Sequence, residues 1–262
     1  MKIHLYTLCY NEMPILPFVI DYWIRLGVTK AVVYDNYSTD GSDTYLANYD
    51  WIEVRKFQTD GLNDVIHQHI KNQCWKESKN DADIVIVCDI DECLWSKLPI
   101  SIYLEDMKKQ RCNVLCNPWY ALCGDKSLDE IRKEYREGVY LHQIVGKGYK
   151  QYINHTQGFA DYGKFILINP NEVEEINWSV GQHILFGITP QLKLYKTDDI
   201  ITFHINKGLN EDFFTERRLT IGKRISNTNK KYGMGIEYLK QEQDIRQEYK
   251  DNQAKAIDIS KL

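Results

Sequence analysis

The sequence predicts an α/β fold built on one mostly parallel sheet with flanking helices, followed by a less regular second half. Three observations predict it. Strand-like and helix-like segments alternate through roughly the first 100 residues, as they do in repeated β-α-β units. The segment Ile84–Cys88 is continuously apolar, which is typical of a strand buried on both faces of a sheet. The chain of 262 residues is also long enough to bury a large core.

The elements of the first half follow from apolar spacing and from turn residues. Alternation predicts a strand over 3–9, and helical spacing predicts a helix over 15–26 that Gly27 is placed to end. Pro14 and Pro17 fall in the first turn of that helix, where proline is tolerated. The same reasoning predicts a helix over 62–77 and further strands over 30–34, 52–57 and 84–88. In such a sheet, ligands bind beyond the carboxyl ends of the strands.

The second half has a weaker pattern. Residues 128–136 indicate a helix or a charged loop, and residues 146–161, rich in Gly, Tyr, Asn and His, indicate a loop. The tail 236–256 is predicted to be helical, with a sparse apolar stripe. Short apolar runs predict strands over 113–116 and 165–168, and a hairpin from 192–195 and 200–204. The stripe of the tail consists of Tyr238, Leu239, Ile245 and Tyr249.

Composition excludes several classes of protein. A net charge of -4 and a pI of about 6.0 argue against a protein that coats nucleic acid. No run approaches the ~18 apolar residues of a membrane span, and the first residues lack the apolar core of a secretory signal. The seven cysteines include no C-x-x-C pair, so we expect free thiols in a reducing, cytoplasmic compartment.

The sharpest candidate site is Asp89-Ile90-Asp91-Glu92, directly after the apolar strand. In extended backbone, Asp89 and Asp91 point the same way from the carboxyl end of the sheet. Two converging carboxylates suit a hard divalent ion such as Mg²⁺ or Mn²⁺, which keeps water and phosphate oxygens as its other ligands. The alternative is a solvated acidic turn, because a bare D-x-D is common by chance.

Two more polar loops follow predicted strands. Asp35–Gly41 carries carboxylate, amide and hydroxyl groups that can hydrogen-bond a ribose or a base edge. The same residue types also form ordinary turns and helix caps, so this loop alone leaves both interpretations open. Thr7–Glu12 would lie beside it in a parallel sheet and is a weak signal by itself.

The three loops together resemble the family 2-like glycosyltransferases of the GT-A fold. The order is T-x-x-x-N-E from Thr7, D-N-x-S-T-D-G from Asp35 and D-I-D-E from Asp89, with Cys93 where this branch often has Phe. The resemblance covers residues 3 to about 95 well and continues more loosely to about 207. It implies a single GT-A domain over 1–262, with a nucleotide-sugar half to about 110, an acceptor half to about 210 and a helical end.

The resemblance also implies roles for individual residues. Thr7, Asn11 and Glu12 would lie near the nucleotide, and Asp35 at the base or ribose. Asp89 and Asp91 would hold Mn²⁺ or Mg²⁺ on the donor diphosphate, which makes Asp91 a catalytic candidate as well. His204, in a late segment of the resemblance, would return toward the diphosphate or the metal. A histidine at a strand end with satisfied hydrogen bonds is the alternative for His204.

An inverting transfer needs a general base to accept the proton of the acceptor hydroxyl. The candidate is Asp125, which follows the acceptor-like segment Asn117–Tyr120; Asp161 and Glu92 are lesser candidates. Asp125 equally suits a surface turn, and a retaining enzyme needs no such base. Lys164 opens a stretch that resembles the family's K-x-I-x-x-P-x-x-V segment, with His183 after it.

We therefore predict a metal-dependent glycosyltransferase. It would move a sugar from a nucleoside diphosphate-sugar, expected to be a UDP-sugar, to a hydroxyl of a glycan or lipid-linked glycan, with inversion. One alternative is a sugar nucleotidyltransferase, although Tyr10–Glu12 is acidic where that class has a basic loop. The other is a protein that binds a sugar nucleotide or glycan without turnover.

The expected partners follow from this function and from charge. No nucleic-acid partner is predicted. A basic stretch late in the chain is either a solvated face or a contact for a diphosphate or for the anionic inner face of a membrane. It contains Arg217, Arg218, Lys223, Arg224, Lys230 and Lys231.

Overall fold

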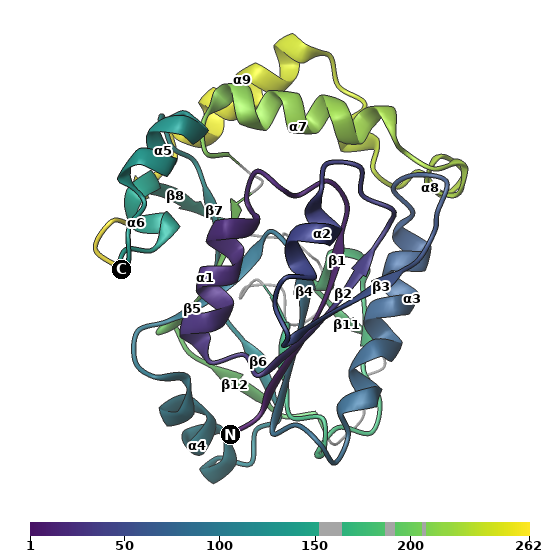
Figure 1. Cartoon of the computed structure of the whole chain (residues 1–262), viewed down its shortest axis with the longest axis vertical. Helices are drawn as coiled ribbons and strands as arrows, with labels where there is room; N and C mark the ends of the chain where they lie inside the picture. The colour runs from purple at the N-terminus through teal and green to yellow at the C-terminus, as the bar shows by residue number, and fades with distance from the viewer. Residues whose placement is uncertain (152–163, 187–191, 206–207) are drawn as a thin grey trace. The chain divides into compact units, whose positions relative to one another are not determined.

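The structure, a computed structural model, describes residues 1–151, 164–186, 192–205 and 208–262 (Figure 1). The chain forms two compact units, each assembled from separate stretches of sequence. The first unit comprises Met1–Gln58, Ile66–Trp119 and Tyr152–Thr202. The second comprises Thr59–Val65, Tyr120–Gln151 and Phe203–Leu262. The prediction of a single domain in three consecutive parts stays a prediction.

A seven-stranded sheet is the centre of the first unit, in the order β12-β6-β9-β4-β1-β2-β3. Strand β9 runs antiparallel to its neighbours β4 and β6, and every other neighbouring pair is parallel. This confirms the predicted α/β fold with a mostly parallel sheet. The strands are β1 (Ile3–Cys9), β2 (Lys30–Asp35), β3 (Ile52–Lys56), β4 (Ile84–Asp89), β6 (Val114–Cys116), β9 (Leu167–Ile168) and β12 (Leu194–Lys196).

The order of these strands places a switch point at β1. The chain moves outward from β1 to β2 and β3, and then returns to the other side of β1 with β4. In the register, Cys9 is opposite Asp35 of β2, and Leu8 is opposite Asp89 of β4. The loops that leave the carboxyl ends of β1, β2 and β4 therefore share one sheet edge, which is where open α/β sheets bind ligands.

Helices cover both faces of this sheet. Helices α1 (Leu16–Leu26) and α3 (Asp64–Cys74) lie on opposite sides of it in Figure 1. On the α3 face, Tyr6, Val85 and Val87 form a buried cluster with Cys74 and Trp75. Because side chains alternate along a strand, the residues between them face α1. As predicted, α1 has proline in its first turn and ends at Gly27, which adopts a left-handed φ of 83°.

Smaller elements complete the first unit. Strands β10 and β11 form an antiparallel pair, and β13 leads from this unit into the second. The elements are α2 (Ser42–Leu46), the 3₁₀ helix η1 (Trp75–Ser78), β5 (Glu92–Ser96), α4 (Ile100–Lys109), β10 (Asn177–Trp178), the 3₁₀ helix η2 (Val180–Gln182), β11 (Leu185–Phe186) and β13 (Ile200–His204).

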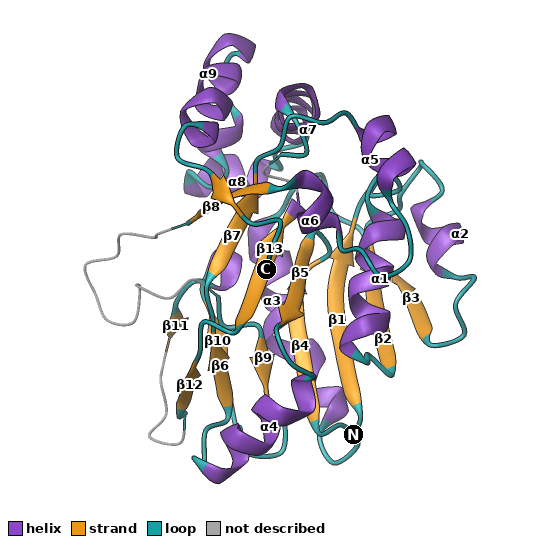
Figure 2. Cartoon of the chain, turned by 90° about the vertical axis from the view of Figure 1, so that its left-hand side faces the viewer, coloured by secondary structure: helices purple, strands orange, loops and turns teal. Residues whose placement is uncertain are grey.

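The second unit combines antiparallel strands with helices (Figure 2). Strand β8 pairs with both β7 and β14, and α7 packs along α9 over buried Phe214, Ile245 and Tyr249. The elements are β7 (Trp119–Leu122), α5 (Leu128–Glu134), α6 (Leu141–Val145), β8 (Lys147–Lys150), α7 (Glu211–Lys223), α8 (Asn227–Tyr232), the 3₁₀ helix η4 (Ile236–Tyr238), α9 (Glu242–Gln253) and β14 (Ile257–Asp258).

The structure corrects three details of the second half. The hairpin predicted from 192–195 and 200–204 is wrong, because β12 pairs in parallel with β6 instead. Residues 147–150, predicted as loop, form strand β8, whose Gly148 lets Ala121 and Ile259 approach closely. In the tail, Ile245 and Tyr249 are buried but Leu239 is exposed, so the predicted stripe is shorter.

Two further findings concern the whole described chain. Within the described residues, no helix is both long and apolar enough to span a membrane. All seven cysteines carry free thiols; six are buried, and Cys112 is half-buried.

Candidate functional site

The loops after β1 and β2 are joined by hydrogen bonds. The Asn11 backbone N–H donates to Ser38 Oγ at 2.9 Å, and the Thr39 N–H donates to the Asn11 side-chain oxygen at 2.7 Å. The Glu12 N–H donates to Ser42 Oγ at 2.8 Å. Asn11 has φ 54°, a left-handed conformation that asparagine tolerates better than most residues. The two polar loops of the sequence therefore form one connected rim.

Asp35 anchors this rim from below. Its side chain is fully buried and accepts hydrogen bonds from the Ser38 N–H at 3.0 Å, the Ser38 hydroxyl at 2.5 Å and Lys56 Nζ at 2.7 Å. Lys56 also pairs with Asp43 at 2.6 Å. Both oxygens of Asp35 are already engaged, so this carboxylate fixes the loop; a contact from Asp35 to a base or ribose stays a prediction.

The other residues predicted near a nucleotide lie at or below the same rim. Thr7 is buried within β1, and its hydroxyl has no hydrogen-bond partner among the described residues. Glu12 is mostly buried at the start of α1, where its carbonyl accepts from the N–H groups of Ile15 and Leu16. Asn11 is half-buried at the rim itself. Of the three, Asn11 is the most accessible to a ligand.

Asp89 ends β4 beside a buried lysine. Lys71 Nζ, from α3, lies 2.6 Å from Asp89 Oδ1, and the Asp89 side chain is 38% exposed. Burial raises the pKa of Asp89, but the charges of Lys71 and then Lys164 outweigh it, so the net pKa is well below its usual range. Burial lowers the pKa of Lys71, but the negative charges of Asp89 and Glu92 raise it by more, so its net pKa is above the ordinary value. Both groups are therefore charged, and Asp89 presents an ionised carboxylate at the sheet edge.

The chain turns directly after Asp89. Ile90 and Asp91 form a two-residue turn between β4 and β5, so the expectation from extended backbone does not apply here. Asp91 is mostly buried, whereas Asp89 is partly open. Glu92 begins β5 and is closed off: it lies 2.5 Å from Lys164 Nζ, and both side chains are almost fully buried.

Lys164 ties the segment before His183 to this turn. Its ammonium also donates to the Gly181 carbonyl and lies 5.0 Å above the Trp119 ring. The neighbouring Gln182 donates to the Val87 carbonyl of β4 at 2.9 Å. His183 then lies with its ring 4.8 Å from that of Trp119. The loosely matching segments of the resemblance thus do reach the end of β4.

Two predicted residues belong to the second unit. Asp125 is exposed and engaged by Lys147 Nζ at 2.6 Å and by the Gln253 amide. His204 is the last residue of β13 and is half-buried. Their predicted roles, base and metal ligand, stay predictions. Asp161, the lesser candidate for the base, lies outside the described residues.

A divalent metal fits the β4 edge only with a small set of protein ligands. Within the described parts of the chain, no three His, Cys, Asp or Glu side chains gather in a way that could hold a metal. Asp89 has one oxygen on Lys71, and it is ionised and partly exposed. Mg²⁺ and Mn²⁺ sites that rely on one or two carboxylates take their remaining ligands from water and substrate phosphate. Asp89 fits that kind of site, and Asp91 as a second ligand stays a prediction.

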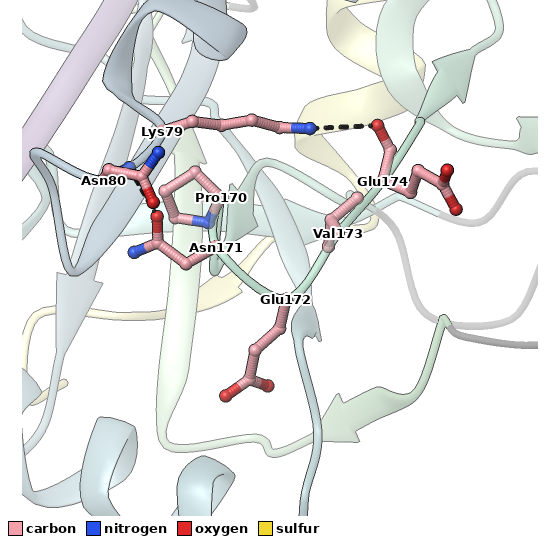
Figure 3. Close-up of a pocket in the computed structure, with 7 residues that line it drawn as sticks. All are labelled: Lys79, Asn80, Pro170, Asn171, Glu172, Val173 and Glu174. Atoms are coloured by element: carbon pink, nitrogen blue, oxygen red, sulfur yellow. Dashed lines mark hydrogen bonds between the residues drawn. The ribbon is translucent and has the colours of Figure 1, made fainter.

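A polar hollow of about 300 Å³ lies elsewhere in the first unit (Figure 3). Lys79 spans it and donates to the Glu174 carbonyl at 3.1 Å. Its walls come from the turn before β4 and from the segment after β9. Strand β9 runs antiparallel to β4, so the segment after β9 lies near the start of β4. The hollow is therefore at the amino end of β4, away from Asp89, and includes no residue of the predicted site.

Three lysines at this sheet edge have little or no motif in the sequence: Lys56 and Lys71 belong to none, and Lys164 belongs only to a loosely matching one. Each of the three neutralises a carboxylate at the sheet edge. Lys71 carries a weak signal in the sequence, because Cys74 and Trp75 follow it one helical turn later in the predicted helix, and a buried lysine without a partner is costly. Nothing near Lys164 in the sequence points to Glu92, which is far away along the chain.

The polar rim lies at the switch point of a mostly parallel sheet, which is where open α/β proteins bind their ligands. The chain matches glycosyltransferase family 92 over residues 6–231, and it belongs to this family. This confirms the predicted class of enzyme, a glycosyltransferase. The narrower resemblance to the family 2-like branch stays a prediction. No curated protein matches the chain in sequence.

Several solved structures are similar to the chain at low identity. A mannosyltransferase from Pyrobaculum calidifontis, in complex with GDP-Man and Mn²⁺, is 12% identical with a TM-score of 0.42, over 85% of this chain and 62% of that one. HddC from Yersinia pseudotuberculosis is 10% identical with a TM-score of 0.39, over 82% and 97%. A mycobacterial protein is 13% identical with a TM-score of 0.44, over 84% and 72%. The chain thus spans less than two thirds of the mannosyltransferase.

Proposed function

We propose that this protein transfers a sugar from a nucleoside diphosphate-sugar to a hydroxyl of a glycan or lipid-linked glycan, with the help of Mn²⁺ or Mg²⁺. A UDP-sugar is the donor to test first. The observation that carries the proposal is the ionised, partly exposed Asp89 at the carboxyl end of β4, beside the rim of the β1 and β2 loops. Membership of a glycosyltransferase family supports it.

The residues of the first unit would share the work. Asn11 and the loop that Asp35 fixes would contact the nucleoside, and Asp89 and Asp91 would hold the metal. When bound, the metal would neutralise the diphosphate as it leaves. Lys71 keeps Asp89 ionised and in place, so that this carboxylate needs no rearrangement before a ligand arrives.

The proposal names no general base. Glu92 is closed inside its pair with Lys164, and both oxygens of Asp125 are engaged. Neither carboxylate is poised to accept a proton from a hydroxyl in this arrangement. Asp91→Ala should abolish transfer without unfolding the protein, because Asp91 belongs to the turn between β4 and β5 and to no strand or helix. A purified Asp91→Ala protein with the wild-type rate would refute the proposed role.

The first experiment is a thermal-shift panel of UDP, GDP and their sugars, each with and without Mn²⁺. A ligand at a hundredfold excess over Kd stabilises the native state by about 2.7 kcal/mol. We expect a shift that needs Mn²⁺ and is lost in Asp89→Asn. The matched control is Asp81→Asn, which breaks another lysine pair, at 2.7 Å from Lys2, before the amino end of β4. This control should keep the shift.

Two results would overturn the proposal. One is a well-folded protein that no nucleotide stabilises, which would favour a binding protein for another ligand. The other is an Asp89→Asn protein that keeps the full Mn²⁺-dependent shift, since the metal would then be bound elsewhere.

A further inference from the structure

The stretch from the middle of α7 to just past η4 carries a charge opposite to that of the whole chain. Residues 217–240 contain seven Lys or Arg residues and one acidic residue, Glu237, whereas the chain has a net charge of -4. Figure 1 shows α7 leading through a short connection into α8. The basic excess is therefore concentrated in one continuous part of the second unit.

Three lysines of this segment are available to a partner. Lys223, Lys230 and Lys231 are all exposed, and none has a carboxylate partner among the described residues. By contrast, Arg218 and Lys240 both pair with Glu248, at 3.0 and 2.9 Å. The basic charge on this surface is thus only partly neutralised within the unit.

The same segment exposes large apolar side chains. Tyr232 is 60% exposed, Ile236 64% and Leu239 54%, all within eight positions of the chain. Single exposed apolar residues are common, but three of them beside three lysines on one short segment form the composition of an interfacial membrane contact. Lysines meet the phosphates of the headgroups while the apolar side chains enter the acyl boundary.

This segment is held firmly, so its exposed side chains are not those of a loose end. Asn229 of α8 is fully buried, and its side chain bonds both the N–H and the carboxylate of Asp64. The guanidinium carbon of Arg218 lies over the ring of Tyr238 in η4, 4.8 Å from the ring centre. Gly222 of α7 allows this contact, because a Cβ there would meet the Tyr238 carbonyl at 2.4 Å.

We propose that Lys223, Lys230, Lys231, Tyr232, Ile236 and Leu239 form a membrane-docking surface for anionic lipid. The evidence for this surface is the charge and the exposure of its residues, and it does not depend on the proposed function. Its purpose, to bring the enzyme to a lipid-linked acceptor, rests on the proposed function. The fit is to a lipid surface rather than to a protein, because exposed cations and exposed large apolar side chains occur together on one short segment, which suits the headgroup and acyl layers of a membrane.

The test is sedimentation of the whole chain with vesicles, without any nucleotide. Vesicles of phosphatidylcholine with about 30% phosphatidylglycerol should bind the protein, and pure phosphatidylcholine should bind it far less. Each lysine near such a surface contributes about fivefold to partitioning, so Lys230→Gln with Lys231→Gln should weaken binding about 25-fold. Ile236→Ser with Leu239→Ser should weaken it about tenfold or more.

A matched control lies in the first unit. Helix α4 also exposes an apolar residue, Ile102, and two lysines, Lys108 and Lys109, but Glu105 and Asp106 stand among them. Lys108→Gln with Lys109→Gln makes the same change of charge and should leave vesicle binding intact. Unfolding temperatures of all variants confirm that they are folded.

Three outcomes would overturn the proposal. The first is a wild-type protein that does not bind anionic vesicles. The second is binding that the α8 and η4 variants keep. The third is a dimer in light scattering that Ile236→Ser with Leu239→Ser separates, which would assign the surface to a second copy of the chain. None depends on donor binding, so the membrane surface and the transfer reaction can fail separately.

Discussion

Two lysine–carboxylate pairs stand at the same end of β4 and differ in one respect. Lys71–Asp89 and Lys164–Glu92 have nearly equal distances, 2.6 and 2.5 Å, and both lysines are buried. The Asp89 side chain is 38% exposed, whereas that of Glu92 is 1% exposed. A closed pair holds segments together, because neither charge can be left alone in the interior. In a partly exposed pair, the lysine can fix the carboxylate in place while the carboxylate stays accessible to a ligand.

The closed pair should give the largest effect. Lys164→Met leaves Glu92 buried without its counter-charge and releases the loop before His183, so the free energy of unfolding should fall by about 3–5 kcal/mol. Urea unfolding measures this. The double variant with Glu92→Gln removes both charges and should recover much of the loss. A single variant that loses under 1 kcal/mol would show that Glu92 is solvated after all.

The partly exposed pair should cost less. Lys71→Met removes the partner of Asp89, but water can reach this carboxylate, so we expect a loss of about 2 kcal/mol in urea unfolding. Lys71→Arg, which keeps the charge, should lose less. If Lys71→Met lowers the free energy of unfolding as much as Lys164→Met does, the exposure of the carboxylate does not determine how much each pair contributes to stability.

The rim of the β1 and β2 loops is held partly by single hydrogen bonds of Ser42, and the loss of these should cost less still. Ser42 is fully buried and joins the Glu12 N–H to Asp40, with its own hydroxyl 2.6 Å from Asp40 Oδ1. Ser42→Ala should cost about 1 kcal/mol in the same assay. Exposed Thr44→Ala is the control and should stay within about 0.5 kcal/mol. Equal losses in the two variants would mean that the rim is not held through Ser42.

The smallest effect is expected from pH. The hydrogen bond from Lys56 lowers the pKa of Asp43 below its ordinary value. A lowered carboxylate pKa stabilises the fold above the unfolded-state pKa of about 4, and this contribution is lost as the pH falls through the folded-state value. The stability difference between wild type and Asp43→Asn, under about 1 kcal/mol, should be constant from about pH 7 to 5 and shrink as the pH falls below about 4. A difference that grows in acid would contradict this.

The sequence predicted the first half of the fold well, because two local signals mark each strand: its apolar pattern and the residues that follow it. Ile84–Cys88 is apolar throughout, and each strand is followed by turn residues or by a capped helix, so local pattern and tertiary position agree. The second half failed where pairing is not local. Strand β12 looks like the partner of β13, its neighbour in sequence, but it pairs with β6, about 80 residues away.

The sequence could indicate where the candidate site lies, but it could not indicate which lysines pair with the carboxylates of the site. Carboxylates after strands show in a sequence, since a strand end and a polar residue are both local signals. The lysines that neutralise them do not, because Lys164 reaches Glu92 only after the whole sheet has formed. The turn at Ile90 and Asp91 was missed for a related reason: the sequence continues into β5, which looks like further strand.

The burial of the cysteines gives the native chain a single position for thiol chemistry. Burial raises the pKa of every one of the seven thiols, and only Cys112, just before β6, has partial access to solvent. A maleimide dye should therefore attach slowly and once, with no cysteine replaced beforehand. Unfolding would open the other six, so the number of dyes per chain counts how much of the population is still folded.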